Sequence, residues 1–232
     1  MEMKVFVVGI GGGVGRRVAK KLTESGDEAT GPVRRPQVGN ELATEGISTV
    51  PGNIVTMSVG DLAGAMRGSD AVVFTAGAGG KDRPDATVQI DGDGPSKLAA
   101  AAELAGVRHF ILVSVFPEAW RERRMDDDFE LYMAEKKKAE TKLVLTDLDW
   151  VIVRPSALTD RPGAGRVDLG LTKIHDEISR DDVADTIIEL LRNPDLHHVI
   201  LEVTAGAQAI VEAVAAIKGW RIPNAPAREA LA

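Results

Sequence analysis

Tyr132 and Lys136, four residues apart, are the side chains of this sequence best suited to acid-base chemistry. A helix is predicted over roughly Phe129 to Leu145, and this spacing puts both side chains on one of its faces, about one turn apart. A phenol with a pKa of about 10 donates its proton poorly at neutral pH, but an adjacent ammonium ion stabilises the phenolate and lowers that pKa. Ser114, the last residue of a strand predicted from His109 to Ser114, adds a hydroxyl group that can orient a carbonyl. The three residues therefore suit proton donation to a developing alkoxide.

A purely structural interpretation of the same pair stays open. Tyr132 is the single tyrosine of the chain, and a Tyr-x-x-x-Lys pair also occurs on helices that carry out no chemistry. In that interpretation Lys136 forms an ion pair with Glu140, one turn further along the helix. A catalytic role also requires a hydride donor beside the pair, and the beginning of the chain bears on that requirement.

The beginning of the chain combines an apolar run with closely spaced glycines. The run Lys4 to Val8 is typical of a strand buried on both faces, and Gly9, Gly12 and Gly15 precede apolar residues at helical spacing. Such glycines allow a tight turn, let a diphosphate approach the backbone and let the helix pack closely on the strand. The helix N-terminus then directs free N–H groups at the phosphates. We therefore predict a dinucleotide site, with an empty structural turn as the alternative.

The end of the second predicted strand, Glu28 to Val33, indicates which dinucleotide binds. In dinucleotide folds a carboxylate at this end binds the ribose 2′-hydroxyl of NAD, whereas an arginine accommodates the 2′-phosphate of NADP. Glu28 lies at the start of the strand, and Arg34 and Arg35 follow its end. Their planar guanidinium groups suit a phosphate. We predict NADP, with NAD as the second possibility and a solvated arginine loop as the alternative without a ligand.

Two more predicted strands end in residues that suit a cofactor crevice. In open parallel sheets, ligands bind outside the carboxyl ends of the strands. Asn53 and Ile54 follow a weak strand at Ile47 to Val50, which makes them candidates for an adenine pocket, although Asn53 suits a plain turn equally well. Asp70 to Thr75 is a clear fourth strand, and the small residues from Ala76 to Gly80 let a cofactor pass close to the backbone.

Other polar segments are given mainly structural roles. A long helix is predicted from near Asp91 to Ala105, with Asp91 and Asp93 in its first turn, where the helix dipole favours negative charge. The charged segment Val115 to Asp128 is predicted to be a solvated loop, with a mobile flap over the site as the alternative. Ser179 to Asp182 is typical of a capped helix start.

The order of the predicted elements indicates the fold class. Strands and helices alternate along the chain, which is typical of crossover connections and of an α/β fold with a doubly wound parallel sheet. The 232 residues, 44% of them apolar, suffice for one domain. We assign residues 1–218 to a dinucleotide-binding domain, with about 155–180 as a small substrate-side segment, and residues 219–232 to a C-terminal tail.

Composition narrows the expected partners and location. The formal net charge of −7 argues against general binding to nucleic acid or to an anionic membrane. The lack of cysteine excludes disulfides and thiolate chemistry. Without an apolar targeting segment or a run of about eighteen apolar residues, the chain is expected to be soluble and cytoplasmic. The four histidines show no metal-binding spacing, so no metal site is predicted, and His197 with His198 is interpreted as a strand-edge pair.

Short motifs spread from Lys4 to about Ile217 resemble those of a known family. They are Gly9-x-x-Gly12-x-x-Gly15, Val33-Arg34, Thr75-Ala76-Gly77, Val113-Ser114, Tyr132 with Lys136, Val153-Arg154-Pro155 and Ile178-Ser179-Arg180-Asp181-Asp182-Val183-Ala184. Together they resemble the atypical short-chain dehydrogenase/reductase superfamily. More narrowly, the chain is similar to its small NAD(P)H-binding branch, which includes flavin and biliverdin reductase-like proteins and proteins similar to NAD-dependent epimerases and dehydratases.

The resemblance implies a Rossmann fold with bound NADP(H). The cofactor contacts that it implies are Gly9, Gly12, Gly13, Val14, Gly15, Arg34, Arg35, Asn53, Ile54, Thr75, Ala76 and Gly77, with further contacts at Lys136 and Pro155. It also implies that Ser114, Tyr132 and Lys136 carry out the chemistry. Larger relatives use an asparagine in a proton relay near the position of Asp91 or Asp93, and the segment after Pro155 is short for a nucleotide-sugar domain.

The expected function is that of an NADP(H)-dependent oxidoreductase. It would transfer a hydride to a small carbonyl, quinone or flavin-type acceptor, with Tyr132 as the proton donor. The alternative is an NADP(H)-binding redox sensor or regulatory protein without robust turnover, and a sugar-nucleotide epimerase or dehydratase ranks below both. The expected partner is a small-molecule substrate, and a homodimer stays open.

Overall fold

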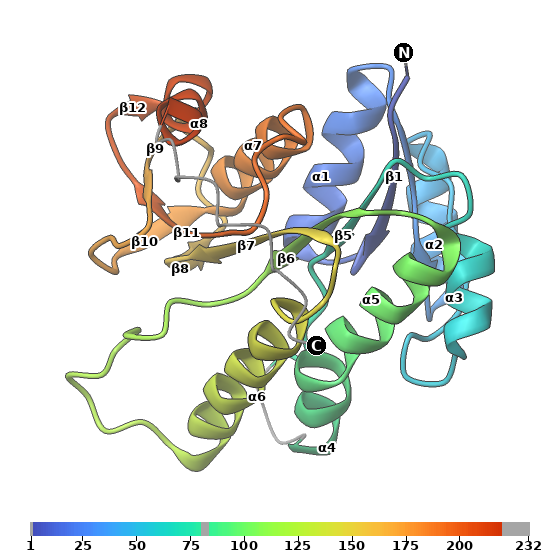
Figure 1. Ribbon diagram of the computed structural model, residues 1–232, viewed down its shortest axis with the longest axis horizontal. Helices are drawn as coiled ribbons and strands as arrows, with labels where there is room; N and C mark the ends of the chain where they lie inside the picture. Colours follow the sequence, from blue (N-terminus) through green and yellow to red (C-terminus); the bar gives the residue numbers. More distant parts are fainter. Residues whose placement is uncertain (1, 80–83, 220–232) are drawn as a thin grey trace, which may run out of the picture.

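A computed structural model describes residues 2–79 and 84–219 of the chain. Its centre is an eight-stranded sheet in the order β12-β9-β11-β7-β6-β5-β1-β2 (Figure 1). The strands of this sheet are β1 (Lys4–Val8), β2 (Glu28–Thr30), β5 (Ala71–Phe74), β6 (His109–Val113), β7 (Asp149–Pro155), β9 (Arg166–Gly170), β11 (Val199–Ala205) and β12 (Gln208–Ala209). Two separate strand pairs are β3 (Pro32–Val33) with β4 (Val50–Pro51) and β8 (Ala157–Thr159) with β10 (Glu177–Ser179).

Helices cover both faces of the sheet. They are α1 (Gly13–Glu24), α2 (Pro36–Thr44), α3 (Val59–Ala65), α4 (Pro84–Ala86), the π-helix η1 (Thr87–Gly92), α5 (Gly94–Ala105), α6 (Asp127–Leu143), α7 (Arg180–Leu191) and α8 (Ile210–Gly219). One hydrophobic core joins one face of the sheet to α1, α2, α7 and α8, and a second joins the other face to α3, α5 and α6 (Figure 1). The predicted single-domain, doubly wound α/β fold is confirmed.

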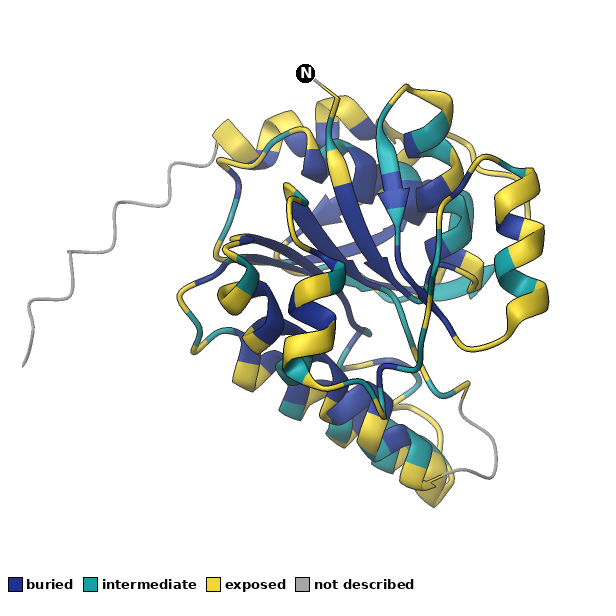
Figure 2. Ribbon diagram, turned by 90° about the vertical axis from the view of Figure 1, so that its right-hand side faces the viewer, coloured by how far each residue is buried: buried dark blue, intermediate teal, exposed yellow. Residues whose placement is uncertain are grey.

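The central strands are buried on both faces because consecutive side chains alternate between the two cores. Val5 and Val7 of β1 point into the first core, whereas Phe6 and Val8 point into the second. Figure 2 shows the sheet as a dark band of buried residues between helices whose outer faces are exposed. This continuous apolar content is typical of parallel strands with helices on either side.

The strand order creates a crevice at one edge of the sheet. From β1 the chain crosses to β2 on one side, whereas β5, β6, β7 and β11 lie in turn on the other side, and these six strands are parallel. Connections therefore leave the carboxyl ends of β1 and β5 in opposite directions. In doubly wound folds ligands bind at such a switch point.

The sheet differs from the predicted all-parallel arrangement at one edge. β9 is antiparallel to β11, and β12 is antiparallel to β9. At its start β9 alternates between exposed and buried side chains. That pattern is typical of an antiparallel strand with one solvated face, and it lies within the segment of about 155–180 in which no strand was predicted.

Two of the predicted strands are wrong in their extent. The strand expected from Glu28 to Val33 is divided into β2 and β3, because Pro32 has no N–H with which to continue the hydrogen bonding to β1. The strand expected at Ile47 to Val50 is reduced to β4, which pairs with β3 outside the main sheet. Ile47 is instead buried in the core just after α2.

The helix predicted from near Asp91 to Ala105 is also different. α5 begins at Gly94, and Asp91 belongs to the preceding π-helix η1, whose wider turn places its side chain in the interior. Asp93 is the N-cap residue of α5 and is exposed. Gly80 and residues 220–232 of the predicted tail lie outside the described residues. In the described part of the chain, the helices are too short or too polar to cross a membrane.

Candidate active site

The turn after β1 brings the ends of two strands close together. Gly9 has a φ of +91°, a conformation that residues with a side chain rarely adopt. A Cβ atom on Gly9 would lie 2.6 Å from the Ala76 nitrogen and 2.7 Å from Thr75 Oγ1. The N–H of Gly12 donates to the Gly9 carbonyl at 2.8 Å, which closes the turn. Glycine at position 9 therefore allows the close approach of the β1 and β5 ends.

The N-terminus of α1 opens into the same crevice. Gly12 is the N-cap residue and has no side chain with which to cap the first N–H groups. The first helical hydrogen bond runs from the Arg16 N–H to the Gly12 carbonyl at 2.9 Å. The N–H groups of Gly13 and Val14 therefore precede the helical ladder. Together with the positive end of the helix dipole, they suit a bound anion.

At the other end of the crevice, Lys136 is buried beside Tyr132 and forms a charge pair with Asp91. Its ammonium group lies 3.1 Å from Oδ1 of the fully buried Asp91 and 3.4 Å from the Val113 carbonyl. The same ammonium lies 5.7 Å from the centroid of the Tyr132 ring. Asp91 Oδ2 accepts a hydrogen bond from the Ala78 N–H at 2.9 Å. The two buried charges are thus paired and held in place, as a low-dielectric interior requires.

Lys136 pairs with Asp91 and not with Glu140, the partner expected in the purely structural interpretation. Glu140 binds the Arg154 guanidinium through two hydrogen bonds of 2.9 and 2.6 Å. Glu202 lies 3.7 Å from the third guanidinium nitrogen of Arg154, Nη1. The Glu140 carboxylate is thus paired with Arg154 of β7, and Lys136 is paired with Asp91.

The pKa of Tyr132 is raised, which contradicts the predicted lowering. Burial raises the pKa of Tyr132, the Lys136 ammonium lowers it, and the Asp91 carboxylate raises it again. Burial also lowers the pKa of Lys136, but Tyr132 and Asp91 outweigh burial and raise it, so Lys136 is an ammonium ion. Asp91 offsets the charge that was expected to favour the phenolate. Tyr132 is therefore a protonated phenol at neutral pH.

Ser114 lies in the same crevice with its hydroxyl group available. Its N–H donates to the Val153 carbonyl at 2.7 Å, whereas its buried Oγ has no hydrogen-bond partner among the described residues. One cleft of about 750 Å³ joins the two ends of the crevice. The predicted residues that line it are Gly9, Gly12, Gly13, Val14, Arg34, Arg35, Asn53, Ile54, Thr75, Ala76, Gly77, Ser114, Tyr132 and Lys136.

Comparison with known proteins shows the family to which the chain belongs. The model of a family described as NAD(P)H-binding matches residues 9–194, a range that includes the glycine turn and Lys136. The chain belongs to this NAD(P)H-binding family. A Bacillus subtilis protein described as an uncharacterized sugar epimerase, YhfK, is 33% identical over 213 residues, which cover 91% of this chain and 99% of that protein.

Two solved structures are similar over nearly their whole length. A candidate NAD-dependent epimerase/dehydratase from Bacillus halodurans has a TM-score of 0.83 and 32% identity, and the match covers 92% of this chain and 99% of that one. The oxidoreductase ylbE from Lactococcus lactis has a TM-score of 0.80 and 28% identity, with 94% and 97% covered. The predicted resemblance to the small NAD(P)H-binding branch and the Rossmann fold are thereby confirmed.

The cleft of this NAD(P)H-binding protein fits a dinucleotide. The free N–H groups of α1 suit a diphosphate, and a neighbouring hollow of about 840 Å³ shares Arg34 and Asn53 with the cleft. That hollow extends the space along β4 and α2, on the side where an adenine ring lies in such folds. Asn53 also forms the turn foreseen for it, because its Oδ1 accepts the Val55 N–H at 3.0 Å.

Two residues expected to touch the cofactor do not line the cleft. Gly15 lies in the first turn of α1 and packs on the turn, since a Cβ atom there would be 2.6 Å from Thr75 Oγ1. Pro155 is the last residue of β7, where it is buried and in register with Val203 of β11. Gly15 therefore allows helix and strand to pack closely, and Pro155 belongs to the sheet.

Sequence reasoning assigned structural roles to two charged residues that line the cleft. From the sequence, the helix dipole alone accounts for a carboxylate at Asp91, so the pairing of Asp91 with Lys136 is not predicted. Arg180 was counted as part of a capped helix start, and Ser179 does cap α7 by accepting the N–H groups of Asp181 and Asp182. Arg180 itself lies over the glycine turn, where a Cβ atom on Gly13 would be 2.8 Å from its Cδ and Nε atoms. The packing of α7 on α1 brings it there.

Proposed function

We propose that this protein is an NADPH-dependent oxidoreductase that reduces a small carbonyl, quinone or flavin-type acceptor. The observation that carries the proposal is the buried Asp91–Lys136 pair beside the Tyr132 ring, in the cleft that also contains the glycine turn. A buried ion pair beside a titratable phenol is typical of a site for acid-base chemistry. The description of the Lactococcus lactis relative as an oxidoreductase agrees with it.

Arg34 and Arg35 support NADP as the preferred cofactor. Both side chains are exposed at the end of β3 and line the cleft, and no described carboxylate forms an ion pair with either. Two uncompensated guanidinium groups at this position suit the 2′-phosphate of NADP. Arg180, next to Gly13, supplies further positive charge for the diphosphate, although Asp160 binds its Nη1 at 3.0 Å.

Each residue of the reacting end has a distinct role in the proposed reduction. A bound nicotinamide ring supplies the hydride. The Ser114 hydroxyl donates a hydrogen bond to the acceptor carbonyl, and Tyr132 transfers its proton to the alkoxide oxygen that forms. Lys136 stabilises the transient phenolate, while Asp91 holds the ammonium in position. Tyr132 then regains a proton from solvent.

The charge around the acceptor end favours an uncharged substrate. Asp126 and Asp128 lie in the cleft at the start of α6, close to Phe129 and Met125. Asp128 is four residues before Tyr132 on the same helix, so the two side chains share one face. These carboxylates repel a phosphate-bearing substrate, such as a nucleotide sugar, more than a neutral quinone or ketone.

The test is NADPH oxidation, followed by its absorbance, with a panel of neutral ketones, aldehydes, quinones and flavins. We expect turnover with an acceptor of this class, and Tyr132→Phe should lower kcat by about 10²–10⁴ with the Kd for NADPH unchanged. Lys137→Ala, on the exposed side of the same helix, is the control and should retain full activity. A nucleotide sugar as the preferred substrate, or an unaltered kcat in Tyr132→Phe, would contradict the proposal.

A further inference from the structure

A second cluster of chemically active side chains lies at the opposite edge of the sheet from the cleft. β7 begins at Asp149, and β11 begins directly after His198, so both residues lie at the amino ends of parallel strands. His109, the first residue of β6, is the register partner of Asp149. This edge takes no part in the function proposed above.

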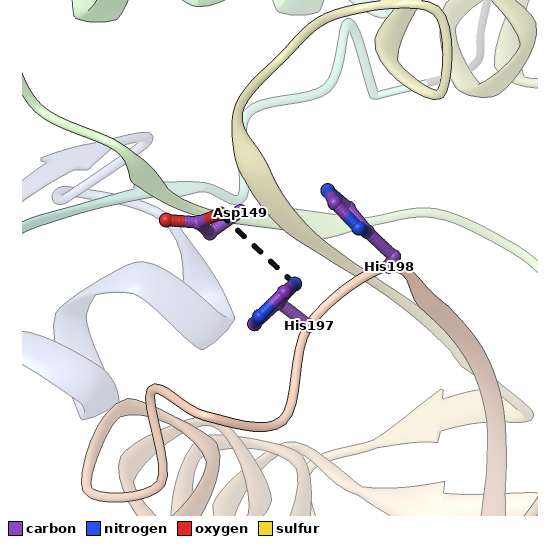
Figure 3. Close-up of side chains that lie close together, drawn as sticks. All are labelled: Asp149, His197 and His198. Carbon is purple, nitrogen blue, oxygen red and sulfur yellow. Dashed lines mark ion pairs between the residues drawn. The ribbon is translucent and has the colours of Figure 1, made fainter. Parts of the chain in front are cut away.

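Three of these side chains lie close together (Figure 3). Asp149, His197 and His198 each offer one oxygen or nitrogen atom, and these atoms all lie within 4.8 Å of one another. The two imidazole rings meet edge to face, with centroids 4.6 Å apart. His197 Nδ1 lies 4.0 Å from Asp149 Oδ1, which is too far for a hydrogen bond.

The gap between His197 and Asp149 is of the size that a metal ion fills. Zn²⁺ binds imidazole nitrogen and carboxylate oxygen at about 2.0–2.2 Å, so tetrahedral ligand atoms lie about 3.4 Å apart. Small rotations of the side chains bring the 4.0 Å separation to that value. His197 Nδ1 is buried and has no hydrogen-bond partner among the described residues, and the same holds for Nε2 of the buried His109 next to the cluster.

The surroundings of the cluster resemble the outer shell of a metal site. His198 Nε2 lies 3.0 Å from the Leu148 carbonyl, which only accepts hydrogen bonds, so this carbonyl orients the imidazole through a proton on Nε2. Both Asp149 oxygens accept hydrogen bonds from Arg108, each at 3.1 Å. A carbonyl that orients an imidazole and a donor that fixes a carboxylate are common partners of metal ligands.

We propose that Asp149, His197 and His198 bind a divalent transition-metal ion such as Zn²⁺ at the amino edge of the sheet. Two imidazoles and one carboxylate select this class of ion over Mg²⁺ or Ca²⁺, which prefer all-oxygen sites. The bound ion links the segment before β11 to the start of β7. The positive charge of Arg108 limits the affinity, so binding on the order of 10 µM is expected.

The experiment titrates ZnCl₂ into protein without a histidine tag, after chelator treatment, and records the heat of binding. We expect one ion per chain, and His197→Gln and His198→Gln should each weaken binding at least about tenfold. His175→Gln is the matched control because this ring packs against Phe116 and Trp120, and it should bind Zn²⁺ like the unchanged protein. The Kd for NADPH should be the same in all four proteins.

A measurement on the unchanged protein covers the case in which a histidine variant folds poorly. The electron paramagnetic resonance spectrum of bound Cu²⁺ should show coupling to two imidazole nitrogens. Binding only in the millimolar range, equal binding by the three histidine variants, or a Cu²⁺ spectrum without nitrogen coupling would overturn the proposal and leave an Asp149–Arg108 ion pair flanked by two histidines.

Discussion

In the half of the cleft around Gly9 the backbone supplies the groups that suit a phosphate, whereas the half around Lys136 depends on charged and polar side chains. The first half is formed by a turn and the helix that directly follows it, and local hydrogen bonds of the turn hold the free N–H groups of the helix in position. The second half combines Asp91 of η1, Ser114 after β6 and Tyr132 of α6. A backbone site depends on conformation, and a side-chain site depends on burial and charge balance.

The difference concerns energetics as well as construction. The Gly9 half requires positions without a Cβ atom, so substitutions there act through steric contact. The Lys136 half holds an ammonium and a carboxylate away from water, and each of these charges is stable only because the other is present. The two halves should therefore respond to substitution in different ways.

The largest expected effect is on stability, from Asp91→Ala. This change leaves the Lys136 ammonium buried without a partner and removes the acceptor of the Ala78 N–H. We expect the free energy of unfolding to fall by about 3–5 kcal/mol, measured by urea denaturation. Asp93→Ala, which removes only exposed ion pairs with Lys138 and Lys142, should change it by less than about 1 kcal/mol.

A double variant separates the buried charge from the lost side-chain volume. If the unpaired ammonium is the cause, Asp91→Ala combined with Lys136→Met should recover most of the lost stability, because no charge then stays buried. Strictly additive losses in the double variant would show that the two side chains contribute independently, and the distinction between the two halves would fail.

The second prediction concerns the backbone half. Gly9→Ala adds a Cβ atom within 2.7 Å of Thr75 Oγ1 at a φ of +91°, so the turn must move and the N–H groups of α1 move with it. The free turn relaxes to relieve this strain and overpacking, and restoring it around the ligand costs about 3 kcal/mol, which corresponds to about 100-fold weaker NADPH binding by calorimetry. Gly26→Ala is the control: its φ is +82°, but a Cβ atom there meets nothing within 4 Å, and NADPH binding should not change.

The sequence revealed the backbone half far better than the side-chain half. Gly9, Gly12 and the start of α1 are neighbours in the chain, so their spacing alone predicts the turn, the helix and the free N–H groups. Tyr132 and Lys136 were found because a helix repeats every four residues or so. The glycine spacing and the Tyr-x-x-x-Lys spacing are both local patterns, so they can be recognised without the tertiary structure.

The missed residues are those whose position depends on distant packing. The sequence places Asp91 near a helix N-terminus, where negative charge is favourable. Its side chain faces Lys136 because it belongs to the π-helix η1, and the residue pattern does not predict a π-helix. Arg180 follows a capping serine and reaches the glycine turn only because α7 packs on α1. The raised pKa of Tyr132 has the same origin, since it depends on burial and on Asp91.

The third prediction uses that raised pKa. Tyr132 donates a proton only below its pKa, so the rate of NADPH-dependent reduction should hold through neutral and mildly alkaline pH and fall as the pH rises through the raised pKa. Asp91→Asn keeps an acceptor for the Ala78 N–H but removes a charge that raises this pKa, so the alkaline fall should begin at lower pH. Profiles of kcat against pH for both proteins test this, with Asp93→Asn as the control. If kcat of Asp91→Asn falls at the same pH as in the unchanged protein, or at a higher pH, the role of Asp91 is contradicted.

The smallest expected effect is on the choice between NADPH and NADH. Arg34→Ala and Arg35→Ala each remove one exposed guanidinium from the side of the cleft where we propose that the 2′-phosphate binds, and each should weaken NADPH binding about tenfold, or about 1.4 kcal/mol. The Kd for NADH should stay the same, because the ribose 2′-hydroxyl carries no charge for these groups to bind. Arg67→Ala, an exposed arginine beyond α3, controls for the overall loss of positive charge. Equal losses for NADPH and NADH would mean that the two arginines shape the adenine end of the cleft without binding the 2′-phosphate. In that case these side chains would not determine which cofactor is preferred.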